Sequence, residues 1–127
     1  MLLGTPKILV VDDEGEICEF TKSFLSKRNY VVFTAQNQSD ALDIVKKESP
    51  HIVLLDVRLG SENGVDVLRQ IKQVDKNIKV IMVTAFDDEA SKKEAAKLGA
   101  DEYIVKPFVS GTLIDILLKK ISDVSLK

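Results

Sequence analysis

The stretch Ile52-Val53-Leu54-Leu55-Asp56 decides the fold, because an apolar run of strand length ends directly in a carboxylate. Such a short apolar run, bounded by polar and turn residues, is typical of a strand buried inside a sheet. The carboxylate that follows it would lie at the edge of that sheet, where open α/β folds bind their ligands. Asp56 is therefore the first candidate for a functional residue.

Three other apolar runs end in the same way. They are Ile8-Leu9-Val10-Val11 before Asp12 and Asp13, Val80-Ile81-Met82-Val83 before Thr84, and Tyr103-Ile104-Val105 before Lys106. If these runs are neighbouring parallel strands, all the polar groups that follow them gather at one end of one sheet. The sequence thus predicts an active site as well as a fold.

Segments with apolar residues at helical spacing separate the runs. We expect strands near residues 7–11, 30–35, 52–55, 79–83 and 102–105, and helices near residues 16–27, 39–47, 65–73, 88–98 and 110–121. Residues 60–64 form a cluster typical of a turn, Gly60-Ser61-Glu62-Asn63-Gly64. The alternation predicts the α/β class and a flavodoxin-like, doubly wound five-stranded parallel sheet in the order 2-1-3-4-5. That order places Asp12 and Asp13 beside Asp56.

Three of the helices have apolar patterns that bear on packing or on partners. The first should turn four residues inward, namely Ile17, Phe20, Phe24 and Leu25. Helix 88–98 has only alanines and Leu98 as apolar residues, so we expect it to be held weakly and to move. The last helix carries an apolar arc of about 200°, which is wider than one-sided burial requires, so part of it should face a partner.

The composition describes one soluble globular domain of 127 residues, 45% hydrophobic and 30% charged. We expect it to span residues 1–127 with a core of about 6–121 and short tails. The net charge of −2 argues against a general nucleic-acid binder. Apolar stretches are too short for a membrane span or a signal-peptide core, which favours a cytoplasmic protein. The single cysteine excludes an intrachain disulfide and a multi-cysteine zinc site. The single histidine, His51, lies in a loop far from the strand ends that carry the acids, which argues against a histidine-based hydrolase triad.

The acidic cluster indicates a metal-assisted reaction. Three carboxylates within a few ångströms repel one another by about 1 to 4 kcal/mol per pair, so a cation should belong among them. Oxygen ligands without histidine or cysteine favour Mg²⁺ over an all-protein Ca²⁺ cage. An aspartate beside Mg²⁺ can be the nucleophile in phosphoryl transfer. Lys106 and the Thr84 hydroxyl can then contact the phosphoryl oxygens.

Each of these residues also has a plainer interpretation. Asp12 and Asp13 could only cap the first helix, Thr84 could be a strand end, and Lys106 could be a solvated surface charge. All of them follow short apolar runs that predict strands of one sheet, and this joint occurrence favours the functional interpretation.

The residues around these positions form five motifs: Leu9-Val10-Val11-Asp12-Asp13-Glu14, Leu54-Leu55-Asp56-Val57-Arg58-Leu59, Val83-Thr84-Ala85, Gly99-Ala100-Asp101 and Lys106-Pro107-Phe108. Together they resemble the receiver domain of two-component response regulators, the chemotaxis-type (CheY-like) family. The resemblance covers about Pro6 to Ile121. It implies a signalling domain that is not a conventional enzyme, since it catalyses only its own phosphorylation and dephosphorylation.

The resemblance implies that Asp56 accepts a phosphoryl group from a phosphohistidine in a sensor histidine kinase or a histidine phosphotransfer protein. Asp13 and Asp56 would bind Mg²⁺ by side chain, Arg58 by its backbone carbonyl and Asp12 mainly through water. Mn²⁺ could substitute for Mg²⁺.

Further roles follow from the same resemblance. Lys106 would pair with the phosphoryl group, and the Lys106-Pro107 bond is expected to be cis. Thr84 and Tyr103 resemble the switch pair of the family, in which the hydroxyl moves toward the phosphate and the ring turns inward. Helix 88–98, strand 102–105 and the last helix would form a surface for an output partner or a homodimer, without direct binding of nucleic acid.

One alternative remains open at this point, and two others lack a residue that they would need. The chain could be a receiver-like scaffold or phosphate sink without switching output. An aspartyl-nucleophile phosphatase would need a second acid two residues after the nucleophile, where this chain has Arg58. A flavin or dinucleotide module would need a glycine-rich loop after the first strand, where Asp12-Asp13-Glu14 would repel phosphate.

Overall fold

A computed structural model describes residues 5–84, 89–105 and 119 of the chain. The elements are, in chain order, β1 (Lys7–Val11), α1 (Gly15–Ser26), β2 (Val31–Ala35), α2 (Gln38–Glu48), β3 (Ile52–Leu55), β4 (Arg58–Leu59), β5 (Glu62–Asn63), α3 (Gly64–Val74), β6 (Lys79–Thr84), α4 (Glu89–Lys97) and β7 (Glu102–Val105). None of the helices in this part of the chain is long and apolar enough to cross a membrane.

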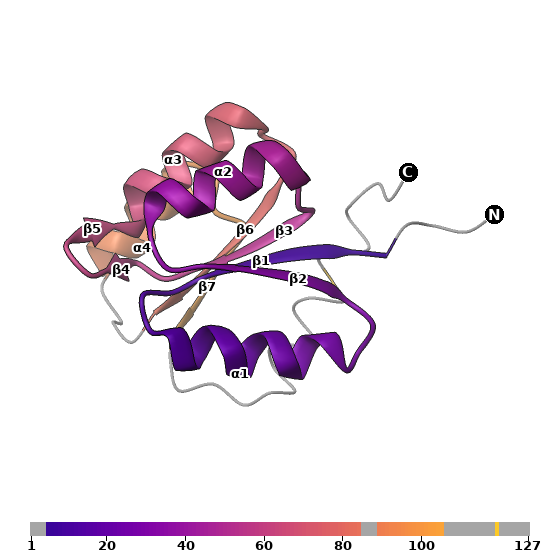
Figure 1. Cartoon of the computed structure of the whole chain (residues 1–127). Coiled ribbons are helices and arrows are strands. Elements are labelled where there is room, and N and C mark those ends of the chain that lie inside the picture. The colour runs from indigo at the N-terminus through magenta and orange to yellow at the C-terminus, as the bar shows by residue number, and fades with distance from the viewer. Residues whose placement is uncertain (1–4, 85–88, 106–118, 120–127) are drawn as a thin grey trace.

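The central sheet has five parallel strands in the order β2-β1-β3-β6-β7, which confirms the predicted topology. Helix α1 covers one face, and α2 and α3 cover the other (Figure 1). Alternate residues of β1 serve the two faces, as the strand period requires. Ile8 and Val10 pack with Cys18 and Leu25 on the α1 side, whereas Leu9 and Val11 join the core on the opposite face.

Local sequence signals explain where the helices begin and end. The Asn37 side chain accepts a hydrogen bond from Asp40 N at 2.9 Å and caps α2, which ends at Ser49 in the left-handed conformation, before Pro50. Gly99 follows α4 with φ +98°, as expected of a residue just past a helix end. Every described element of the sheet and its helices lies within about two residues of its predicted bounds, the uncertainty that helix ends normally carry.

Two expectations are corrected. Phe20 does not face the core: it is 67% exposed, because it lies two positions from buried Cys18, about 200° around the helix. Instead its ring stacks on Phe24, with centroids 6.4 Å apart, and the Arg28 guanidinium lies over the Phe24 ring. The turn cluster is also more ordered than predicted, since β4 and β5 pair there as a small antiparallel hairpin.

The last predicted helix, over residues 110–121, and the Lys106-Pro107 bond lie outside the described residues, of which only helical Lys119 belongs to that segment. The extent of the domain, with its core of about 6–121, stays a prediction.

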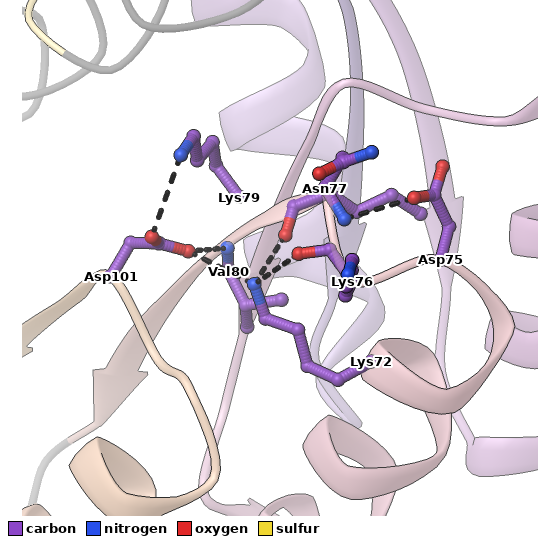
Figure 2. A network of polar contacts seen from close by, with 8 residues as sticks. Lys72, Asp75, Lys76, Asn77, Lys79, Val80 and Asp101 are labelled. Carbon is purple, nitrogen blue, oxygen red and sulfur yellow. Dashed lines mark hydrogen bonds and ion pairs between the residues drawn. The ribbon is translucent and has the colours of Figure 1, made fainter.

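Asp101 closes a polar network between the amino ends of β6 and β7 and the end of α3 (Figure 2). Its Oδ2 accepts hydrogen bonds from Val80 N at 2.8 Å and from Lys72 Nζ at 3.2 Å, and Lys79 Nζ lies 3.9 Å from its Oδ1. Lys72 Nζ also donates to the Ile78 carbonyl at 2.6 Å. Asp101 therefore has a structural role at the end of the sheet opposite to the end where Asp56 lies.

Replacing Asp101 with alanine is expected to lower the free energy of unfolding by about 2 kcal/mol, because the Val80 N–H and the Lys72 ammonium lose a shared, mostly buried acceptor. Urea denaturation measures this change. Asp66→Ala is the matched control: Asp66 pairs with Arg69 on the exposed face of α3, and its loss should cost under about 1 kcal/mol. Equal losses in the two variants would contradict the structural role of Asp101.

Candidate functional site

Asp12 and Asp56 become neighbours because the strands before them are paired. Val11 lies opposite Leu55 in the β1–β3 register. The hydrogen-bond ladder continues one residue further, since Asp56 N donates to Val11 O at 3.0 Å and Asp12 N donates to Ala35 O at 3.1 Å. The backbones of both aspartates are thus fixed by the sheet, at its carboxyl end.

The three predicted aspartates form one cluster. One carboxylate oxygen each from Asp12, Asp13 and Asp56 lie within 4.8 Å of one another. Asp12 is buried, at 4% exposure, Asp56 is half-buried and Asp13 is exposed. Asp12 Oδ1 accepts a hydrogen bond from Glu14 N at 3.0 Å, and α1 begins without a side-chain cap. The clustering of the three carboxylates favours the functional interpretation of Asp12 and Asp13 over a role as helix caps alone.

The cluster has the donor set of a hard divalent cation. Three carboxylates at this spacing repel one another by about 1 to 4 kcal/mol per pair, and a bound cation reverses that repulsion. Oxygen donors alone suit Mg²⁺, which takes a few carboxylates and keeps several waters. Among the residues that the structure describes, this is the group of acidic, histidine and cysteine side chains close enough to hold an ion.

Thr84 and Tyr103 lie on the next two strands. Thr84 ends β6, is completely buried and pairs with Val105 of β7. Tyr103 is half-buried on β7, and Lys92 Nζ of α4 lies 5.7 Å from its ring centroid. Lys106 directly follows Val105 but lies outside the described residues. The roles of Thr84, Tyr103 and Lys106 remain predictions.

His51 lies at the opposite end of the sheet, as expected for a residue without a catalytic role. Its ring Nδ1 accepts a hydrogen bond from the backbone N–H of Lys7 at 2.9 Å. The backbone N–H of His51 donates to the Lys7 carbonyl oxygen at 2.9 Å. Burial lowers the pKa of His51, and the positive charge of Lys7 lowers this pKa further. Both effects favour the neutral imidazole, the form in which Nδ1 can accept that bond.

The sequence did not indicate how the loop after Asp56 supports the cluster. Arg58 N donates to Asp56 Oδ1 at 3.1 Å, and Gly60 N donates to Asp13 Oδ2 at 3.0 Å. Gly64 N donates to Val57 O at 2.6 Å, so the start of α3 is pressed against the backbone beside Asp56. The turn composition of residues 60–64 indicated a tight loop but carried no signal for these contacts.

Comparison with known proteins agrees with this geometry. Residues 8–118 match the response regulator receiver domain family. A receiver domain protein (CheY-like) from Methanospirillum hungatei JF-1 is 28% identical, with a TM-score of 0.91 over 94% of this chain and 96% of that one. A response regulator from Thermotoga maritima is 30% identical, with a TM-score of 0.83 over 93% and 98% of the two chains. The BeF3-activated DrrB receiver domain is 30% identical, with a TM-score of 0.84 over 93% and 98%.

The parallel sheet with an acidic pocket at its carboxyl end defines a phosphoacceptor signalling domain rather than a conventional enzyme. This chain belongs to the response regulator receiver domain family, the CheY-like proteins of two-component signalling. A receiver domain implies a kinase partner.

Proposed function

We propose that Asp56 is the residue that accepts the phosphoryl group, and that the donor is a phosphohistidine of a sensor histidine kinase or a histidine phosphotransfer protein. The observation that carries the proposal is the cluster of Asp12, Asp13 and Asp56, whose carboxylate oxygens lie within 4.8 Å of one another. Of the three, Asp56 combines partial exposure with a backbone fixed by the sheet. It can therefore receive a group from another protein without losing its position.

Asp13 and Asp56 would hold Mg²⁺ by their side chains, Arg58 would contribute its backbone carbonyl, and buried Asp12 would act mainly through water. Mn²⁺, which has similar ligand preferences, would substitute. When bound, the ion supplies positive charge against the oxygens of the phosphoryl group. The donor set of the cluster supports this assignment.

In the transfer, a carboxylate oxygen of Asp56 attacks phosphorus and the P–N bond to the donor histidine breaks. The donor histidine is the leaving group, and its ring nitrogen takes up a proton where the phosphoryl group was bound. The product is an acyl phosphate on Asp56. Lys106 and the Thr84 hydroxyl are proposed to contact two of the phosphoryl oxygens. The position of Thr84 at the end of β6 supports this, because β6 pairs with β3, which Asp56 follows. Lys106 follows β7, the next strand of the same sheet, which pairs with β6.

The signal is proposed to leave through Thr84 and Tyr103 toward a surface made by α4, β7 and the last predicted helix, which would bind an output partner or a second copy of the chain. The weak anchorage of α4 supports this route, since within the described residues Ala95 is its one buried side chain. Such a helix shifts between two positions at low cost. Docking to a kinase and its phosphorylated histidine fits the predicted cytoplasmic location.

The proposal is tested by intact-mass measurement after incubation with acetyl phosphate, with and without Mg²⁺. We expect one added HPO₃ group when Mg²⁺ is present and none when the ion is removed with a chelator, because the acidic cluster then repels the donor. Restoring Mg²⁺ or adding Mn²⁺ should restore the adduct. Equal labelling with and without a divalent ion would contradict the proposed metal site, and no labelling at all would favour a scaffold without phosphoacceptor activity.

A further inference from the structure

The loop between β3 and α3 is a small hairpin that faces the acidic cluster. Arg58 pairs with Asn63 and Leu59 with Glu62, and Gly60 makes the turn with φ +62°. In Figure 1 this hairpin lies beside the carboxyl ends of the central strands, near the start of α2. A positive φ at the turn is a conformation that glycine adopts without steric cost.

Two backbone N–H groups of the hairpin point to two carboxylates of the cluster. Arg58 N donates to Asp56 Oδ1 at 3.1 Å, and Gly60 N donates to Asp13 Oδ2 at 3.0 Å. The second bond joins residues 47 positions apart, so it fixes the hairpin against the loop after β1. A hydrogen bond to an ionised acceptor is roughly twice as strong as a neutral one.

The hairpin is held in place on its other side as well. Leu59 is buried in the core, and Glu62 Oε1 accepts a hydrogen bond from Gln38 N at 2.8 Å, at the beginning of α2. The position of the Gly60 N–H is therefore set by the fold and does not depend on a cation. Asp13, by contrast, is exposed, and its carboxylate can rotate about the side-chain bonds unless a partner holds it.

We infer that the Gly60 N–H is a positioning donor for Asp13: it holds Oδ2 so that the second carboxylate oxygen is presented to the cation. The inference rests on the proposed Mg²⁺ site and deepens it. Hydrogen-bond partners of metal ligands typically change metal affinity by about 10-fold to 100-fold when they are removed. The hydrogen bond from Gly60 N to Asp13 Oδ2 and the metal site are thus coupled, and ion binding in turn strengthens that bond.

The test replaces the Gly60 N–H by an ester oxygen, using glycolic acid at position 60, and measures the Mg²⁺ dissociation constant by calorimetry with the whole chain. We expect an affinity about 10-fold weaker than that of wild type. Gly60→Asn is the matched control, because asparagine keeps the N–H and tolerates positive φ, and a Cβ at this position meets nothing within 4 Å. Its affinity should stay close to the wild-type value.

A second measurement follows the backbone amide of Gly60 itself. The chain has six glycines, so their amide signals form a small group in a ¹H–¹⁵N spectrum and can be followed individually. Because coupling is reciprocal, saturating Mg²⁺ should slow hydrogen exchange of this amide by about the factor that the ester loses in affinity. Unchanged exchange, or an ester variant with wild-type affinity, would overturn the role of Gly60 and leave the metal site intact. An equal loss in Gly60→Asn would overturn it too, whereas absence of Mg²⁺ binding by wild type would overturn both proposals.

Discussion

Asp56→Asn protein is expected to take up no phosphoryl group under conditions that label wild type completely. Asparagine has nearly the same shape, so β3 and its ladder to β1 are retained, but the amide oxygen is a far weaker nucleophile than a carboxylate and carries no charge for a cation. Intact mass after incubation with acetyl phosphate and Mg²⁺ measures the difference. Asp66→Asn, on the exposed face of α3, changes the same functional group and should be labelled as wild type is.

The same substitution has a second expected effect, which is independent of phosphorylation. Removing one of three clustered negative charges relieves repulsion of about 1 kcal/mol or more, so metal-free Asp56→Asn protein should be more stable than metal-free wild type. Saturating Mg²⁺ should reduce or reverse this difference, because wild type has the additional anionic ligand. Full labelling of the variant, or a lower stability without Mg²⁺, would contradict the placement of Asp56 in the acidic cluster.

Gly64→Ala, which adds one methyl group beside the site, is expected to destabilise the fold strongly. A Cβ at Gly64 would fall on the carbonyl oxygen of Asp56 and within 3.0 Å of Val57 Cα. Both are backbone atoms of a segment that the sheet holds, so either α3 retreats or Asp56 moves. Overpacking of this kind costs about 1 to 3 kcal/mol and occasionally more. We expect a loss of about 3 kcal/mol in urea denaturation, together with slower phosphorylation.

Gly15→Ala is the control for this substitution, because Gly15 also begins a helix and the atoms nearest its Cβ belong to the flexible Gln36 side chain, at 3.4 Å. Alanine there should be neutral or stabilising by about 0.5 kcal/mol, since it lowers the entropy of the unfolded chain. If Gly64→Ala were as stable as Gly15→Ala, the close approach of α3 to the backbone of Asp56 would be wrong.

The fold was predictable because its main signals are local. Runs such as Ile52-Val53-Leu54-Leu55 have strand length, the segments between them have helical spacing, and a right-handed crossover rule orders the strands. Phe20 was misplaced because helical spacing puts it one turn from Phe24, which does pack against the core, so the pattern assigned both rings to the same face. Which of the two rings is covered depends on how α1 docks against the sheet, which is tertiary information.

For the site, the strand ends indicated the three aspartates, and the sheet register brings them together as expected. The contacts that support them were not predictable. The bond from Gly60 N to Asp13 Oδ2 links two loops far apart in sequence, and the contact of Gly64 with Asp56 depends on the path of α3. Such contacts involve backbone atoms, which leave no pattern in the side-chain sequence.

Chemical mapping of the phosphorylated residue tests the central claim most directly. Protein labelled with acetyl phosphate and Mg²⁺ is treated with borohydride, which reduces an aspartyl phosphate to homoserine, and its peptides are sequenced by tandem mass spectrometry. We predict homoserine at position 56 and unchanged aspartate at positions 12 and 13. Homoserine at Asp12, at Asp13 or at an aspartate outside the cluster, with Asp56 intact, would contradict the account.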